Sequence, residues 1–302
     1  MNSGFAKQLV FRSPLLAIGI FRCAPSHEDF EDTGPSLGYS VVFPRVPVEI
    51  TQSGRNPVVA DPNVAMLYNK GQEYRRRALC KAGDRCEWFG FKRKTIENAV
   101  RVSGNCDLNS DGLFFASHSL VNPSDYFLQR LIYRYVTQTP IDHIDQLLVE
   151  ETALRLLENV LALSRRDASP YKRNSRQSVH LIHEIRQVLS TRFKESIQLN
   201  ELASMFDVSP FHLCRRFRKE TGLSVHQHIT HLRLRTALEW LEEGCPDLTR
   251  LALDLGYSSH SHFSSVFRKT FDLTPSQARN SGFSDLKNRI SNILTAEPKH
   301  DS

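Results

Sequence analysis

The second half of the chain contains an internal repeat, and no other feature of the sequence restricts its fold as strongly. The segment that begins at Leu199, LNELASMFDVSPFHLCRRFRKETGLSVHQ, aligns with the segment that begins at Leu248, LTRLALDLGYSSHSHFSSVFRKTFDLTPSQ. The first parts match at an offset of 49 residues and the second parts at an offset of 50, so the inserted residue falls in a turn. The sequence therefore contains one supersecondary unit twice.

Each copy has the pattern of a helix, a turn and a second helix. In the first copy the apolar residues have the i, i+3, i+4, i+7 spacing of a helix face, with Asn200 as its predicted cap. Asp207 and its counterpart Gly256 occupy the turn, where a residue that tolerates the left-handed conformation is expected. Ser209-Pro210 then predicts the start of the second helix, as does Ser258 or Ser259 in the other copy.

A helical projection at about 100° per residue separates the second helix of each copy into an apolar and a polar side. The predicted inward anchors are Leu213 and Phe217 in the first copy and Phe263 and Phe267 in the second copy. The outward side of the first copy carries several basic residues, and the Arg-Lys pair recurs in the second copy. A solvated basic face would explain one such helix, but not two helices with the same anchors and the same preceding turn.

This arrangement predicts a DNA-reading role for both helices. Their first turns are placed to read base edges, and basic residues near their far ends are placed to contact phosphates. The predicted base-reading residues are Phe211, His212, Cys214, Arg215, Ser261, His262 and Ser265. The predicted phosphate contacts are Arg218, Lys219, Arg268 and Lys269. Arg215 has the geometry for a bidentate contact with guanine.

The segment between the copies, Val225 to Glu243, contains no Gly or Pro and predicts one continuous helix. Its length would be about 28 Å, which is close to the ~34 Å between successive major grooves on one side of DNA. A rigid helix of this length would present both reading helices to adjacent grooves. We interpret its His228 and His231 as surface or phosphate-near residues.

These residues together resemble the AraC/XylS family of bacterial transcription regulators. The resemblance covers about 178 to 282 and includes both repeat copies, the Arg233-Leu234 to Ala237 and Leu241 pattern, and the preceding VHLIHEIRQVLSTRF. It implies a seven-helix domain with two helix-turn-helix units, control by a ligand or partner, and contact with RNA polymerase. Asp272, where the family often has Gly, and Ala278, where an aromatic residue is usual, depart from the pattern.

The first half has a different composition, with short β-rich runs such as LLAIGI, YSVVF and CEWFGF separated by turn residues. It loosely resembles the cupin-type sensing domain of many family members. Two helical segments follow, in which Leu147, Leu154 and Leu161 lie seven residues apart, so dimerisation and packing on the chain's own β domain both stay open. The predicted fold is α+β with two domains: a cupin-like β-barrel with flanking helices, then an all-α double helix-turn-helix domain.

The predicted boundaries are 1–163 for the sensor with dimerisation helices, 164–177 for a linker, 178–283 for the DNA-binding domain and 284–302 for a polar tail. The linker is polar, contains Pro170 and has no apolar periodicity. No apolar run reaches the ~20 residues of a membrane span, and the start lacks a signal-peptide pattern, so we expect a cytoplasmic protein.

Rival functions have weaker support in the sequence. His27, His118 and His143 lack the spacing of a metal-bearing cupin, so neither an enzyme nor a metal or other cofactor is expected. Cys23, Cys80, Cys86 and Cys106 fit buried structural thiols better than zinc ligands or nucleophiles. A redox- or cysteine-dependent DNA-binding sensor stays open through the pair Cys80 and Cys86. A ligand-independent adaptor or repressor is a second alternative. The run Arg75 to Arg77 fits a solvated edge or a contact for an acidic effector.

The sequence thus predicts a sequence-specific transcription regulator, an activator that responds to an effector. Double-stranded DNA is the expected partner, in agreement with a net charge of +6. RNA polymerase follows from the resemblance, and a small-molecule effector and a second copy of the chain stay open as further partners.

Overall fold

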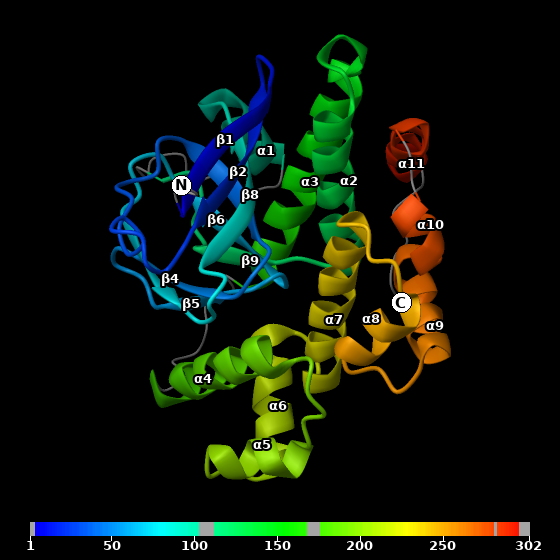
Figure 1. Ribbon diagram of the computed structural model, residues 1–302. Coiled ribbons are helices and arrows are strands. Elements are labelled where there is room, and N and C mark those ends of the chain that lie inside the picture. The colour runs from blue at the N-terminus through cyan, green and yellow to red at the C-terminus, as the bar shows by residue number, and fades with distance from the viewer. Residues whose placement is uncertain (1–3, 103–111, 168–175, 281–282, 296–302) are drawn as a thin grey trace.

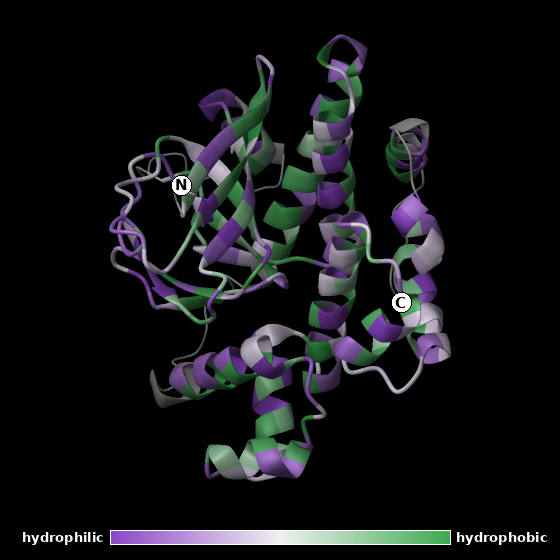
Figure 2. Ribbon diagram, viewed as in Figure 1, coloured by the Kyte–Doolittle hydropathy of each residue, from purple (hydrophilic) through white to green (hydrophobic). Residues whose placement is uncertain are grey.

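The computed structural model describes residues 4–102, 112–167, 176–280 and 283–295 (Figure 1). Two antiparallel sheets and four helical segments occupy the first part of the described chain, and helices alone occupy the second part. Cys106 lies outside the described residues, as does most of the predicted linker. Coloured by hydropathy, α4 (Arg176–Arg192), α7 (Val225–Glu242) and α9 (His260–Phe271) carry both hydrophobic and hydrophilic residues, as amphipathic helices do (Figure 2).

The strands form a six-stranded sheet in the order β1-β2-β8-β3-β6-β9 and a three-stranded sheet in the order β5-β4-β7. Their bounds are β1 (Phe5–Arg12), β2 (Leu16–Cys23), β3 (Tyr39–Pro44), β4 (Val48–Gln52), β5 (Val58–Ala60), β6 (Val64–Tyr68), β7 (Tyr74–Ala78), β8 (Asp84–Phe91) and β9 (His118–Leu120). The run pattern fits a β-barrel or a sandwich, and the resemblance implies a cupin-like barrel. The described strands do not close into one hydrogen-bonded barrel, because β4, β5 and β7 pair only with one another.

Strand β8 separates two environments because successive side chains point to opposite faces. Cys86 and Trp88 line a cavity between the two sheets, whereas Glu87 and Phe89 are fully buried on the side of the helices. Gly19 of β2 lies opposite Trp88 of β8 and lets the indole ring approach the backbone closely. A Cβ at Gly19 would lie 2.3 Å from the indole ring and 2.4 Å from the carbonyl oxygen of Gln8.

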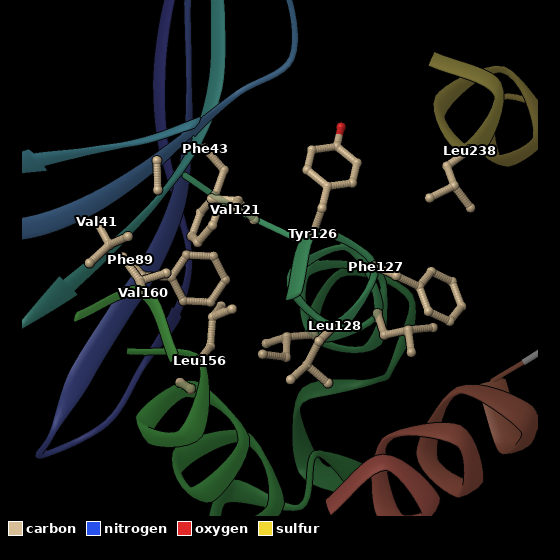
Figure 3. Close-up of a cluster of buried hydrophobic side chains, with 14 of the residues drawn as sticks. Val41, Phe43, Phe89, Val121, Tyr126, Phe127, Leu128, Leu156, Val160 and Leu238 are labelled. Atoms are coloured by element: carbon tan, nitrogen blue, oxygen red, sulfur yellow. The ribbon is translucent and has the colours of Figure 1, made fainter. Parts of the chain in front are cut away.

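The helical layer begins with α1 (Arg93–Val102), α2 (Pro123–Gln138), a short 3-10 helix η1 (Ile141–His143) and α3 (Gln146–Asp167). Asn122 caps α2 by accepting a hydrogen bond from the backbone N–H of Asp125, and Pro123 stands in the first turn. Figure 3 shows α2 between the sheet residues Phe43 and Phe89 on one side and Leu238 of α7 on the other. Helix α2 therefore joins the β part to the helical part.

The heptad leucines of α3 do not form one apolar stripe. Leu147 is 72% exposed, Leu154 is half-buried and Leu161 is 5% exposed. The buried side of α3 is instead made by Leu156, Val160 and their neighbours, which pack on the sheet and on α2 (Figure 3). The packing of α3 on its own β part is thus observed. Helix α3 also continues to Asp167 and α4 begins at Arg176, both inside the predicted linker.

Seven helices, α4 to α10, occupy the continuous described stretch from Arg176 to Asn280. Besides α4, α7 and α9, they are α5 (Leu199–Met205), α6 (Pro210–Thr221), α8 (Leu248–Asp254) and α10 (Pro275–Asn280). The predicted cap Asn200 lies inside α5, whose cap position is Gln198 without a side-chain cap bond. Asp207 has the left-handed conformation expected of it, with φ 50°, and its counterpart Gly256 has φ 80°.

The two helix-turn-helix units are packed in different ways. The first unit, α5 and α6, shares a small core with α4, to which Ile185, Leu202 and Phe217 belong. The second unit, α8 and α9, belongs to the large core that also contains α2, α3 and one sheet face. Phe271 of α9 contacts Phe127 of α2, with their ring centroids 5.3 Å apart. The second unit is therefore continuous with the N-terminal half, and the first unit is not.

A further helix, α11 (Phe283–Thr295), occupies residues for which the sequence predicts a polar tail. Leu286 and Ile290 are buried in the large core, and Arg155 of α3 donates hydrogen bonds to the carbonyl oxygens of Ile293 and Leu294. Apolar residues spaced i, i+4 pack on α2 and α3, so the first part of the segment named as a tail, as far as Thr295, belongs to a packed helix. No helix in the described ranges is long and apolar enough to span a membrane.

The separate cores predict different effects for the same substitution at equivalent repeat positions. Phe217→Ala removes a fully buried ring from the small core and should cost about 3–5 kcal/mol locally. In hydrogen–deuterium exchange of the full-length protein, α4 to α6 should exchange faster while α2 and α9 stay protected. Phe267→Ala should increase exchange in α2, α7 and α9. An equal increase of exchange in both units in either variant would contradict the assignment of two cores.

Candidate nucleic-acid interface

Helix α6 is fixed at both ends by residues that match its sequence signals. Ser209 accepts a hydrogen bond from the backbone N–H of His212 at 3.2 Å, Pro210 occupies the first turn, and Gly222 ends the helix with φ 68°. Leu213 and Phe217 are fully buried and hold the helix against α4 and α5. The opposite face of α6 is therefore turned outward.

Helix α9 repeats this arrangement fifty residues later. Ser259 caps it by accepting from the backbone N–H of His262 at 3.1 Å, and Phe263 and Phe267 are fully buried. From 261 to 270 the order of exposed, half-buried and buried residues is the same, position by position, as from 211 to 220. Two helices with different sequences thus present the same face to solvent.

The predicted base-reading residues lie on these outward faces. Phe211 is 77% exposed, which is unusual for a phenylalanine, and Cys214 is half-buried. The other exposed members of the set are His212, Arg215, Ser261, His262 and Ser265. Two contacts orient the His262 side chain. Its ring centroid lies 5.6 Å from that of Tyr257, and its Nδ1 forms a hydrogen bond with Ser258 Oγ at 3.4 Å.

The predicted phosphate contacts are also exposed, at Arg218 and Lys219 on α6 and at Arg268 and Lys269 on α9. In the described ranges, no carboxylate forms an ion pair with Arg215, Arg218, Arg268 or Lys269. Beside α9 the surface is hollowed over about 570 Å³, and the hollow is lined by Ser264, Ser265, Arg268, Lys269, Asp272 and Thr274. This face offers cations and hydroxyl groups and is suited to an anionic polymer.

Arg233 of α7 ties the two units together. Its guanidinium donates to the carbonyl oxygens of Phe193 at 2.7 Å, Glu195 at 2.9 Å and Gly256 at 2.8 Å. The first two carbonyls follow α4, and the third lies in the turn of the second unit. Gly256 permits this approach, since a Cβ there would lie 2.7 Å from Arg233 Nη2. At 18 residues, α7 is about 27 Å long.

The interpretation of His228 as a surface residue is wrong. Its side chain is 1% exposed, and its Nε2 lies 3.5 Å from the buried Asp61 carboxylate of the N-terminal half. Burial lowers the pKa of His228, and it also lowers the pKa of the half-buried His231 to about 3. About two turns after His228 on α7, Arg235 is fully buried and donates to the carbonyl oxygen of Pro62 and to Asn63. Sequence reasoning missed this contact, although the spacing of His228 and Arg235 by seven residues places both on one helix face.

The sheets enclose a cavity of about 670 Å³, which is lined by Tyr68, Tyr74, Trp88 and other residues of both sheets. Arg76, in the middle of the predicted basic run, lies in its wall rather than at a solvated edge. Arg76 donates to Asp84 at 3.1 Å, and its guanidinium lies 4.7 Å from the centre of the Phe21 ring. The exposed Arg75 and Arg77 flank it, and Arg77 pairs with Glu49.

The cysteines of the described ranges are free thiols. Burial raises the pKa of Cys86 well above its usual value and also raises that of Cys23, which disfavours the reactive thiolate. No group of three or more His, Cys, Asp or Glu side chains in these ranges is arranged to hold a metal ion.

Comparison with known proteins finds a family model that matches within the helical part. Residues 202–281 match the model of a helix-turn-helix domain. The chain is 23% identical over 194 residues to the Msm operon regulatory protein of Streptococcus mutans, covering 64% of this chain and 66% of that protein. It is 30% identical over 96 residues to the HTH-type transcriptional activator RhaS of Pectobacterium carotovorum, covering 32% of this chain and 34% of RhaS.

Among solved structures, the C-terminal domain of AraT, a response regulator from Geobacillus stearothermophilus, is 28% identical, with a TM-score of 0.32. This match covers 36% of the chain and 87% of the AraT chain. The chain therefore spans about two thirds of the first of these relatives and about a third of RhaS.

Replacement of Arg233 tests whether its three hydrogen bonds hold the two units together. Lysine keeps the charge but lacks the planar fork, so Arg233→Lys should lower the free energy of unfolding by about 1–3 kcal/mol in urea denaturation. Arg250→Lys is the matched control, because Arg250 is exposed and pairs only with Asp254 of its own helix. Equal stability of the two variants would show that the bridge contributes nothing.

Proposed function

This chain belongs to the AraC/XylS family of DNA-binding transcription regulators, and we propose that it binds specific DNA sites through α6 and α9 and activates transcription in response to an effector. The observation that carries this proposal is the identical burial order of 211–220 and 261–270. Exposure to solvent alone does not explain why two helices of different sequence have the same exposed face.

In this proposal the two helices have the same division of roles. Residues of the first turns read base edges, and Arg215 makes a bidentate contact with guanine in the major groove. Arg218, Lys219 and their counterparts at the far ends hold phosphates and fix the register without reading sequence. The roughly 27 Å length of α7 and the Arg233 bridge support binding in adjacent major grooves on one side of the duplex.

The N-terminal half is the proposed sensor. Its cavity of about 670 Å³ is within the size range of small-molecule sites, which supports an effector as ligand. The relative named as an activator, RhaS, supports activation and hence contact with RNA polymerase as the outcome of DNA binding. A second copy of the chain remains a proposed partner, for which the exposed Leu147 of α3 offers one apolar contact.

Two substitutions on α6 distinguish base reading from phosphate contact. Arg215→Ala should weaken binding to a cognate site by about 1–3 kcal/mol and relax the preference at one base pair. Lys219→Ala should weaken binding to all sequences and reduce the slope of log K against log salt by about one. Both are measured by mobility shift of the full-length protein at several salt concentrations, with specific and competitor DNA.

Lys70→Ala is the charge-matched control, because Lys70 is an exposed lysine in the N-terminal half. It removes one positive charge without altering α6 and should leave both the preference and the salt slope unchanged. If Arg215→Ala kept full discrimination between bases, the assignment of Arg215 to base reading would be wrong. If the salt slope were near zero for every protein tested, the helices would hold a protein partner and not DNA.

A further inference from the structure

We propose that the cavity between the sheets binds an organic anion with an apolar body, and that the turn Asp61-Pro62-Asn63, next to strand residues of its wall, transmits occupancy to the first helix-turn-helix unit. This inference rests on the proposed function, in which the N-terminal half is a sensor. It adds the chemical class of the ligand and the residues that connect the cavity to the DNA-binding helices.

The lining of the cavity indicates an apolar body for the ligand. Aromatic and aliphatic side chains from both sheets form most of the wall, among them Phe21, Met66 and Trp88. The buried Arg76 does not offer a free charge, because Asp84 neutralises it and its remaining donors reach Phe30 and Thr33. The interior therefore carries no net charge and favours a ligand without a charge at its buried end.

The cavity also carries unbalanced positive charge and an unused donor. Lys7, Arg12 and Lys92 line it, are exposed and have no ion-pair partner among the described residues. The Tyr68 side chain is 6% exposed and lines the cavity, but its hydroxyl forms no hydrogen bond with any described residue. An acid group beside the three cations and an acceptor near Tyr68 would satisfy both features.

The turn from Asp61 to Asn63 connects the cavity wall to the outside of the sheet. It joins β5 to β6, and the strand residues on either side of it, Ala60, Met66 and Tyr68, line the cavity. Asp61 and Asn63 are at most 1% exposed although both are polar. A ligand in contact with Ala60 or Met66 thus lies within a few residues of a turn whose polar groups are wholly buried.

Helices α4 and α7 bind this turn from the other side. From α7, Arg235 donates to the carbonyl oxygen of Pro62 and to Asn63 Oδ1, and the Asn63 amide donates to the carbonyl oxygen of His228 at 3.2 Å. From α4, Ser190 donates to Asp61 at 2.7 Å, and Arg186 Nη2 lies 3.6 Å from the same carboxylate.

These contacts favour the charged form of Asp61. Burial alone would raise the pKa of the Asp61 carboxyl, but Arg186, His228 and Ser190 together lower it below its usual value. The carboxylate is thus held as an anion inside the interface, and a shift of the turn would leave it without its partners.

The two helix-turn-helix units are attached to the N-terminal half by different kinds of contact. The second unit is joined to the N-terminal half by an apolar core, which adapts to small shifts. The first unit has its own core, and α4 meets the sheet through polar side chains spaced i, i+3, i+4, i+7: His183, Arg186, Gln187 and Ser190. Buried polar contacts depend on distance and angle, so a displaced turn would release the first unit while the second stays docked.

The test uses 1-anilinonaphthalene-8-sulfonate, an aromatic anion, with N-phenyl-1-naphthylamine as the matched probe that lacks only the sulfonate. The full-length protein should bind the sulfonate saturably by fluorescence and the neutral amine more weakly. The double variant Arg12→Ala/Lys92→Ala should weaken binding of the sulfonate about tenfold, and Met66→Trp, which fills the cavity, should abolish it. Equal binding of both probes, or unchanged binding in Met66→Trp, would overturn the ligand class or its location.

Transmission is measured by hydrogen–deuterium exchange of the same full-length protein with and without the sulfonate. Occupancy should change exchange in α4 and in the first half of α7, and leave α9 unchanged. In Arg235→Met the probe should still bind, but exchange in α4 should no longer change on binding. Slow exchange in α9 confirms that this variant is folded. Asn63→Ala removes the same contact from the side of the turn. A response that persists in both variants, or that is absent in the wild type, would overturn the role of the turn.

The DNA affinity of the probe-free protein is recorded in parallel. Sequence-specific binding together with failed transmission would leave the proposed function intact and reject only the coupling. Loss of sequence-specific binding in the probe-free wild type would reject the proposed function itself, whatever the probes do.

Discussion

The structure depends on a single helix, α7, which contacts three parts of the protein at once. Through Arg233 it fixes α4 to the turn of the second helix-turn-helix unit, and through Leu234 and Leu238 it enters the large core. Its remaining face, with His228 and Arg235, meets the N-terminal half. Because one rigid helix makes all three contacts, a shift at any of them changes the position of α6 relative to α9. This supports the proposal that regulation of DNA binding originates far from these two helices.

Burial of aromatic rings determines where the positive charge goes. Phe217 and Phe267 are fully buried, so the arginine and lysine that follow each of them must lie outward. Between the helical part and the N-terminal half, by contrast, charges are buried in pairs: Arg130 with Glu242, Arg45 with Glu239, and Asp61 with Arg186. Such pairs contribute little net stability compared with apolar contacts but require one geometry. The arginine and lysine residues of α6 and α9 thus lie at the surface, whereas the buried charge pairs define one position of the helices.

Much of the helical half could be predicted because its signals are local. Ser209, Ser259 and the left-handed Asp207 are specified by neighbours a few residues away, and the anchors follow from helical periodicity. The buried state of His228 and Arg235 could not be predicted, since their partners Asp61 and Asn63 lie more than 160 residues earlier in the chain. Strand pairing in the first half is likewise non-local, which is why β-rich runs predict strands but not the separation into two sheets. The segment from 284 has the composition of a polar tail, whereas Leu286 and Ile290 have the i, i+4 spacing of the buried face of α11.

The central claim is that α7 holds α6 and α9 so that they enter neighbouring major grooves from the same side of one duplex. Hydroxyl-radical footprinting of the full-length protein on a genomic fragment that it selects measures this arrangement directly. The account predicts two protected patches about 10 base pairs apart on one face of the helix. A single patch, or two patches on opposite faces of the duplex, would contradict it.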